Sequence, residues 1–363
     1  MTTQRIEVIH PDDMSPTDVE LWGEVRAGTA PVANPFMSSE FCRAVGRVRR
    51  GARVAVVRQD GESAGFFPFE RGRWGRGRAI GLGVSDCQGA VLRSGLQVDP
   101  RELLRASALD VWEFNHLESG QDLFLPFVTG RFASPVIDLS AGYAQYETVL
   151  RTRSRKFLKS TLAQDRRLGR HVGPLKFVFD ERNPEALRTL MAWKSAQYRR
   201  TGRRDRFAQT WITNLVRILA DTAAPACSGV LSVLYAGDRP VAAHFGLRSR
   251  TVLSCWFPSY DRSFAKFSPG LVLHLRMIEA AASAGIGMLD LGRGDAAYKD
   301  ALKTRELTVH EGALLRPRPG AALHWLSREP SRAVRRFVRE RPQLKAAAVH
   351  TMETVGKMRE RRS

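Results

Sequence analysis

Cysteine is scarce in this 363-residue chain, and its four cysteines form no Cys-x-x-Cys pair. Without such spacing the sequence predicts neither a zinc site nor a disulfide framework, and it favours a reducing compartment. No run approaches the ~18–20 uncharged apolar residues that a membrane span needs. The first residues also lack the basic-then-apolar order of a signal peptide. We therefore expect a cytoplasmic protein without a metal site.

Several catalytic motifs are missing as well. The chain has no Gly-x-Ser-x-Gly elbow, no Gly-x-x-x-x-Gly-Lys-Ser/Thr loop, and no Gly-x-Gly-x-x-Gly following a strand. Its eight histidines are not paired at metal-ligand spacing. These absences favour either chemistry on an anionic substrate without a resident cofactor, or binding alone.

Acidic residues are in short supply, with 37 Asp and Glu against 57 Lys and Arg, a formal net charge of +20. The excess is concentrated in residues 151–206, with 17 basic against 5 acidic, and in residues 316–363, with 13 against 4. Concentrated positive charge recruits polyanions such as phosphorylated cofactors, RNA or an acidic membrane face. A GC-rich coding bias explains why 48 of the basic residues are arginine, but it does not explain the clustering.

An internal repeat organises the rest of the chain, whose length suggests two domains at ~100–200 residues each. Residues 52–58 and 63–70 flank an Asp-Gly turn, and residues 230–235 and 240–247 flank a Gly-Asp turn. Apolar runs separated by such turns indicate antiparallel hairpins. After each hairpin, further elements follow in the same order at an offset near 177 residues: strands 78–86 and 251–261, helices 100–108 and 271–284, and strands 111–117 and 288–292. Before each hairpin lies a helix, which begins at Ser38 in the first copy and at Gln209 in the second.

The order helix, helix, hairpin, strand, helix, strand predicts an α+β (mixed α/β) fold. We expect two tandem domains, 1–142 and 143–316, each a mostly antiparallel twisted sheet flanked by helices. Between the copies, residues 143–169 have leucines at helical spacing and predict one amphipathic helix with a basic outer face. Its role is either packing between domains or binding an anion. Residues 317–363 predict a basic helical tail.

The second copy contains the richest candidate site. Ser268-Pro269-Gly270 stands directly before an apolar helix, with serine at the N-cap and proline in the first turn. Unpaired N–H groups at such a start suit a phosphate or carboxylate, although many helices begin this way without binding anything. Asp290 lies in an apolar strand that ends on Gly292, so the carboxylate needs a hydrogen-bond partner, for example in a neighbouring loop that it caps.

Lysine, tyrosine and histidine in the second copy supply further candidates. Lysine is rare, none occurring before Lys156, and Lys299 follows Tyr298 just after the Asp290 strand. A compact ammonium can neutralise a phosphate or an oxyanion, or it can simply belong to a solvated helix face. His244 shares a strand face with Ala242 and Gly246, whose small side chains leave room for a ligand. A histidine there can serve as general base or have a purely structural role.

These pieces in combination resemble the second half of the CelD/BioF2-like acyltransferases of the GNAT superfamily. The likeness rests on Ser268-Pro269-Gly270, on Leu289-Asp290-Leu291-Gly292 and on Tyr298-Lys299. Arg155-Lys156 resembles the start of the family's basic helix, and Trp193-Lys194 resembles its polar-lysine helix motif. The family is similar in turn to Fem-type aminoacyltransferases. The GNAT pyrophosphate signature Gln/Arg-x-x-Gly-x-Gly/Ala is absent from both halves, and Ser268-Pro269-Gly270 takes its place.

The resemblance implies two GNAT-like domains and acyl transfer from acyl-CoA to an amine or hydroxyl. The acceptor would be a small molecule or glycan of envelope polysaccharide or secondary-metabolite biosynthesis. On this reading the start of the helix at Gly270 holds the donor phosphate, His244 takes a proton and Lys299 stabilises the oxyanion. The predicted catalytic residues are His244, Tyr298 and Lys299, and the predicted binding residues are Ser268, Pro269, Gly270, Asp261, Asp290, Gly292, Lys194 and Arg155.

Two alternatives stay open. In the first, aminoacyl-tRNA is the donor, as in Fem-type proteins, and the basic helix from Arg151 to Arg170 binds the tRNA. In the second, the chain is a basic adaptor without catalysis, whose tail docks on anionic membrane. DNA is not an expected partner.

Overall fold

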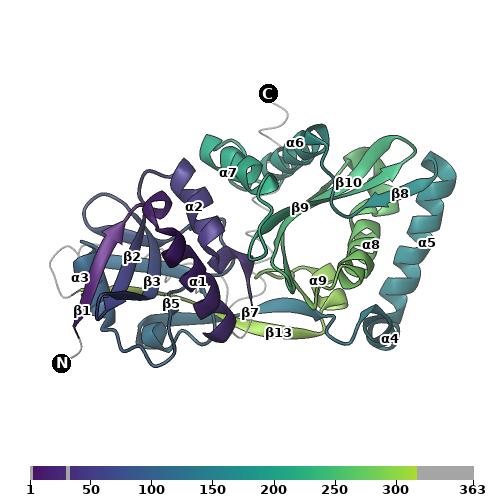
Figure 1. The fold of residues 1–363 in the computed structure, drawn as a ribbon. Helices are drawn as coiled ribbons and strands as arrows, with labels where there is room; N and C mark the ends of the chain where they lie inside the picture. Colours follow the sequence, from purple (N-terminus) through teal and green to yellow (C-terminus); the bar gives the residue numbers. More distant parts are fainter. Residues whose placement is uncertain (1–2, 30–32, 317–363) are drawn as a thin grey trace.

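The computed structural model describes residues 3–29 and 33–316 (Figure 1). The first half contains the helices α1 (Pro16–Thr29), α2 (Ser39–Val48) and α3 (Pro100–Ala106), with short 3-10 turns η2 (Pro35–Met37) and η3 (Asp122–Phe127). Its strands are β1 (Gln4–Ile9), β2 (Ala52–Gln59), β3 (Glu62–Arg71), β4 (Arg76–Ala79), β5 (Val91–Leu92), β6 (Val111–Leu117) and β7 (Val128–Asp138).

The second half repeats this order after two additional helices, α4 (Tyr143–Arg153) and α5 (Arg155–Val172). Its other helices are α6 (Pro184–Arg200), α7 (Thr210–Ala220), α8 (Pro269–Ser283) and α9 (Ala297–Leu302), with a 3-10 turn η4 (Arg262–Phe267) before α8. Its strands are β8 (Leu175–Val178), β9 (Ser228–Ala236), β10 (Arg239–Arg248), β11 (Val252–Tyr260), β12 (Met288–Asp290) and β13 (Arg305–Leu315). The α+β fold and the repeat are thus confirmed.

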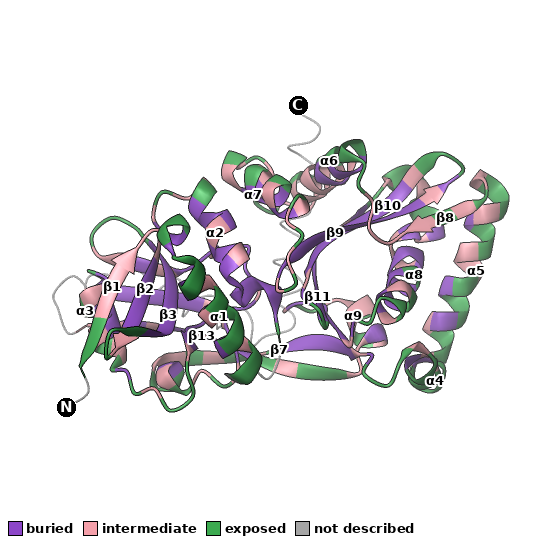
Figure 2. Ribbon diagram, viewed as in Figure 1, coloured by how far each residue is buried: buried purple, intermediate pink, exposed green. Residues whose placement is uncertain are grey.

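The predicted elements differ from the structure in two places. The strand expected over 78–86 is only the short β4, because the chain turns over residues 80–84, where Gly81 and Gly83 have positive φ. The single helix expected over 143–169 is two helices, since Ser154 has φ −132° and ψ 37° and interrupts the helical path. The basic outer face expected for this region lies on α5, whose outer side is exposed (Figure 2).

The two halves share one sheet, in the order β1-β2-β3-β4-β6-β13-β7-β12-β11-β10-β9-β8. Strand β7 of the first half pairs with β12 of the second, and β13 of the second half pairs with β6 of the first. β7 and β13 occupy equivalent places in the repeat, and they pair with each other so that Phe132 lies opposite Val309. Each half therefore completes the other's sheet across an approximate two-fold axis, which the repeat alone did not predict.

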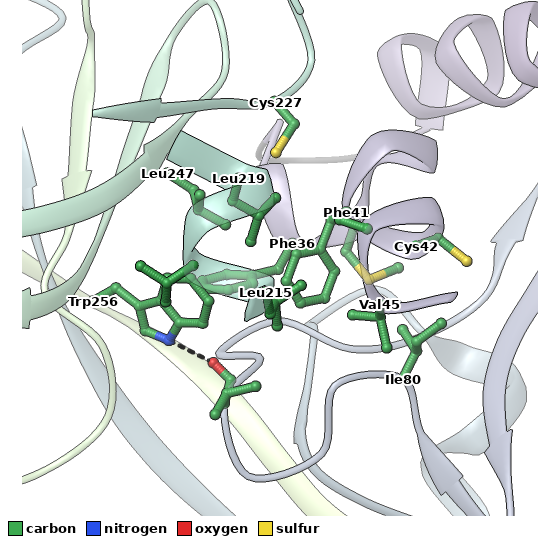
Figure 3. Close-up of a cluster of buried hydrophobic side chains, with 14 of the residues drawn as sticks. Phe36, Phe41, Cys42, Val45, Ile80, Leu215, Leu219, Cys227, Leu247 and Trp256 are labelled. Carbon is green, nitrogen blue, oxygen red and sulfur yellow. Dashed lines mark hydrogen bonds between the residues drawn. The ribbon is translucent and has the colours of Figure 1, made fainter. Parts of the chain in front are cut away.

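The hydrophobic core also continues from one half to the other. Helix α2 packs against α7, and one buried cluster includes side chains of both halves (Figure 3). Phe36 makes an edge-to-face contact with Trp256, at 5.3 Å between ring centroids, and the Trp256 indole donates to the Val84 carbonyl at 2.7 Å. Burial of aromatic side chains contributes strongly to stability, so the halves are held together by core packing as well as by hydrogen bonds.

The domain boundaries proposed at residues 142 and 316 stay a prediction, and the tail 317–363, with its suggested helices and membrane contact, lies outside the described residues. Among the helices that the structure describes, none has the length and apolar content to cross a bilayer.

Candidate active site

The candidate site lies where two parallel strands separate. β11 and β12 pair at only three positions, from Val252 opposite Met288 to Ser254 opposite Asp290. β12 then ends, whereas β11 continues to Tyr260. Beyond Ser254, the backbone groups on the edge of β11 that faces β12 therefore have no strand partner in β12. We call this place the β11–β12 opening.

Lys194 lies on the β11 side of the opening. Its Nζ, from the last turns of α6, donates to the Pro258 carbonyl of β11 at 2.8 Å. Burial, together with the charges of Arg203, Arg206 and Lys299, lowers the pKa of Lys194 to about 8. The polar-lysine motif of the sequence analysis thus supplies an ammonium to the opening.

Lys299 lies on the β12 side. Its Nζ donates to the Gly292 carbonyl at 2.8 Å, and burial lowers its pKa although the carboxylates of Asp86 and Asp290 act in the opposite direction. Gly292 has φ +73°, and a Cβ there would lie 3.3 Å from Asp86 Oδ2. Glycine therefore fits both the turn after β12 and the close approach of the first half.

Asp290 is a buried anchor between the halves. Its Oδ2 accepts from Asn34 Nδ2 at 3.2 Å, and its Oδ1 accepts from Ser134 Oγ at 3.1 Å and the Gly292 N–H at 2.9 Å. Burial raises its pKa. The expected hydrogen-bond partners are present, so Asp290 connects η2, β7 and the turn that carries Lys299.

Three first-half or loop residues at this place were not among the predicted site residues. Asp86 and His116 come from the first half, with Asp86 Oδ1 at 3.7 Å from His116 Nε2, and Arg206 comes from the loop between α6 and α7. Burial raises the pKa of Asp86 to about 6, against the opposing charges of Arg206 and Lys299, and lowers that of His116 to about 4. Only the folded chain brings these residues to Lys299, so spacing within one copy gave no signal for them.

The start of α8 departs from the expected anion site. Ser268 stands at the N-cap but adopts a left-handed conformation, φ 49° and ψ 48°, and makes no side-chain capping bond. The Ser268 N–H donates to the Ala265 carbonyl and the Leu271 N–H to the Ser268 carbonyl, while Pro269 has none. Within this turn, Gly270 is the residue whose N–H has no partner in the described structure, so one donor remains where several were expected.

The histidines lie behind the opening. The His244 ring is fully buried, and neither of its nitrogens has a partner among the described residues. It fills the space beside Gly246, whose Cβ would lie 2.8 Å from the ring, so the room expected for a ligand is occupied by His244 itself. Burial holds its pKa well below the usual value. His274 stands between His244 and Tyr298, with ring centroids at 6.2 Å and 5.1 Å, and its Nδ1 lies 2.6 Å from the Gly270 carbonyl.

Two predicted binding residues lie apart from this group. The Asp261 carboxylate caps η4 through the Ser263 N–H and pairs with Arg239 at 2.7 Å, so its oxygens are already engaged. Arg155 is exposed at the first turn of α5. In the part of the chain that the structure describes, no cluster of three or more side chains could hold a metal ion.

Comparison with known proteins places this geometry in a family. Residues 155–300 match the model of the acetyltransferase (GNAT) domain. The fold is similar to the crystal structure of FemX, with a TM-score of 0.56 and 11% identity over 85% of this chain and 96% of that one. It is also similar to a conserved protein of unknown function from Bacteroides thetaiotaomicron, with a TM-score of 0.55 and 12% identity over 84% and 98%.

A third similar structure is the C-terminal domain of a lysylphosphatidylglycerol synthetase homologue from Agrobacterium fabrum, with a TM-score of 0.52 and 12% identity over 79% and 90% of the two chains. No curated protein sequence matches. At these identities the similarity concerns the fold, and the sequence match concerns residues 155–300. The chain thus consists of two GNAT-like halves, and residues 155–300, most of the second half, match the acetyltransferase (GNAT) domain.

Proposed function

We propose that the chain transfers an acyl group from acyl-CoA to an amine or hydroxyl acceptor at the β11–β12 opening. The observation that carries this proposal is the pair of buried ammonium groups on the two sides of the opening, Lys194 at Pro258 and Lys299 at Gly292. Two such charges favour an anion between the strands. An oxyanion that develops in a water-poor site gains most from donors already fixed in place.

The start of α8 would hold the donor's phosphates. The Gly270 N–H points out of the first turn of a 15-residue helix, whose dipole favours negative charge there. Lys266 and Arg167 both contact the adjacent Phe267 ring, with charge-to-centroid distances of 5.0 Å and 5.9 Å. These two cations compensate for the small number of free N–H groups.

The transfer step assigns one role to each group. The acceptor nitrogen or oxygen attacks the thioester carbon, its proton passes to the Asp86 carboxylate, and the carbon–sulfur bond breaks. Lys299 stabilises the tetrahedral oxyanion, and Tyr298, whose raised pKa keeps its hydroxyl protonated, donates a proton to the leaving thiolate. The proton on Asp86 then passes through solvent to the tyrosinate, which restores both groups. We assign the base to Asp86 because its carboxylate is partly exposed and an acceptor can reach it, whereas His244 is fully buried. His244 as the base stays a prediction, and it would need a proton path through His274.

Donor binding tests the proposal. Thermal unfolding is measured with CoA, acetyl-CoA and longer acyl-CoAs, since a ligand at 100 Kd adds ~2.7 kcal/mol to stability. We expect stabilisation by an acyl-CoA and its loss in Lys194→Met and Lys299→Met, with Lys159→Met on the outer face of α5 as the matched control. A chain that no acyl-CoA stabilises would overturn the proposal.

An aminoacyl-tRNA donor is the second candidate, supported by the exposed basic face of α5, which extends from Arg155 to Arg170. Helix α5 packs beside η4, so this face is continuous with the donor end of the opening. RNA binding by phosphate contacts weakens steeply with salt. Filter binding of charged tRNA at rising salt, with Arg155→Glu and Arg166→Glu together, tests this candidate, and affinity that ignores salt would exclude it.

A further inference from the structure

A second cavity lies away from the β11–β12 opening, between α6, α7 and the sheet. Its volume is about 500 Å³, within the range that holds small ligands. Leu187 and Met191 of α6 line it together with Leu231 of β9 and Phe245 of β10. All four are almost fully buried, with at most 8% of their surface exposed. The cavity therefore has an apolar floor that can take an apolar side chain.

The rim of the cavity is charged but balanced. Asp180 pairs with Arg182 at 2.6 Å, Arg188 pairs with Glu185, and the Tyr235 hydroxyl donates to Glu181 at 2.8 Å. These pairs satisfy most of the rim within the protein. A ligand with a single charge therefore gains no ion pair from these side chains.

Two opposite charges on the rim have no such pairing. The guanidinium of Arg217, in the last turn of α7, and the carboxylate of Asp221, at its C-cap, line the cavity without a side-chain partner in the described structure. The Asp180 Oδ1 is in addition buried without a donor. Both features point to a ligand that carries an anion and a hydrogen-bond-donating cation of its own.

The spacing of these charges limits the ligand. Arg217 and Asp221 are four residues apart on one helical turn, so their Cβ atoms are ~5–6 Å apart. A free α-amino acid carries its ammonium and carboxylate on one carbon, so both can reach these two neighbouring side chains at once, whereas the charged termini of a peptide lie further apart. We infer that this cavity binds a free amino acid with an apolar side chain, its carboxylate on Arg217, its ammonium on Asp221 and Asp180, and its side chain on the floor. This inference is independent of the proposed acyl transfer.

Calorimetric titration tests the inference with four probes: L-phenylalanine, L-phenylalaninamide, N-acetyl-L-phenylalanine and glycine. We expect phenylalanine to bind tightest, the two singly charged analogues to bind at least tenfold more weakly, and glycine not to bind. Arg217→Gln should weaken phenylalanine at least tenfold and leave phenylalaninamide unchanged, because the amide has no carboxylate to lose. Asp221→Asn should weaken phenylalaninamide and leave N-acetylphenylalanine unchanged.

Arg204→Gln, an exposed arginine in the loop between α6 and α7, is the matched control and should leave all four affinities unchanged. Leu187→Trp, which fills the floor, should abolish binding of phenylalanine. The Arg217 and Asp221 variants are on the surface and test the inference even if Leu187→Trp does not fold. Absence of phenylalanine binding, or an affinity that Arg217→Gln leaves unchanged, would overturn it.

Discussion

The first half has an opening equivalent to the β11–β12 opening, but there a side chain of the protein itself occupies it. β4 and β6 also run parallel and pair at only three positions. Beyond them Gln88 lies along β6, where its Oε1 accepts from the N–H groups of Asn115 at 2.9 Å and His116 at 3.1 Å. Its Nε2 donates to Asn115 Oδ1 at 2.9 Å. An internal side chain thus takes the hydrogen bonds that a ligand would otherwise make.

The second half places cations where the first half places an amide. Lys194 donates to one carbonyl, and Lys299 donates to those of Gly292 and, at 3.5 Å, Arg293, so each ammonium keeps at least one further N–H donor for a ligand. The same arrangement of strands therefore supports a closed, structural junction in one half and a binding site in the other. The difference arises from a few side chains and the length of β4, since the topology is common to both.

The largest effect is expected from Lys299→Met. Losing the charge that faces the oxyanion should lower the rate of thiol release from acyl-CoA by ~10²–10³-fold. Lys303→Met, four residues further along and engaged with Asp300 and Glu306, should change it little. If Lys299→Met lowers the rate of thiol release less than threefold, the active site is not in the second half.

Asp86→Asn tests whether the first half contributes to the site in the second. We expect a rate loss of at least ~10²-fold, as for removal of a general base. In the native protein the rate should rise with pH through about 6, the raised pKa of Asp86, and this limb should vanish in the variant. A pH–rate profile identical in the two proteins would assign the base elsewhere.

The same substitution should raise stability. A carboxyl whose folded pKa lies above its unfolded value favours folding below the unfolded pKa, and this contribution is lost as pH rises through about 6. At pH 7.5 the ionised, partly buried Asp86 thus destabilises the fold, by at most about 3 kcal/mol at 1.36 kcal/mol per pKa unit. Urea unfolding should therefore show Asp86→Asn more stable at pH 7.5, with a smaller gain at pH 4.

Gln88→Ala is expected to lower stability and to leave the rate unchanged, the reverse of Asp86→Asn. It leaves the Asn115 N–H and its neighbours without an acceptor in a buried place, which should reduce the free energy of unfolding by about 2 kcal/mol. The folded fraction should retain its rate of thiol release. The exposed Gln145→Ala is the control for urea unfolding. A large rate loss in folded Gln88→Ala would mean that the first opening also takes part in the reaction.

The sequence predicted those parts of the fold and site that depend on local pattern. Hairpins, the 177-residue repeat, the buried Asp290 strand and the lysine at 299 all follow from alternation, turn residues and composition. The exchange of β7 and β13, and the approach of Asp86 to Gly292, depend on contacts between segments some 200 residues apart, for which one chain has no local signal. The room expected beside His244 was misjudged, because a small neighbour such as Gly246 can be small to accommodate the histidine ring itself.

The smallest predicted effect concerns two serines that stand at the N-cap of a helix, one in each half, Ser38 before α2 and Ser268 before α8. Ser38 Oγ accepts from the Phe41 N–H at 3.1 Å and caps α2, so Ser38→Ala should cost ~1 kcal/mol in urea unfolding. Ser268 makes no capping bond and has a positive φ, so Ser268→Ala should change stability by less than ~0.5 kcal/mol and Ser268→Gly should raise it by up to ~1 kcal/mol. If Ser268→Ala costs as much as Ser38→Ala, the hydroxyl caps α8 after all, and the Gly270 N–H would no longer be free for the donor phosphate.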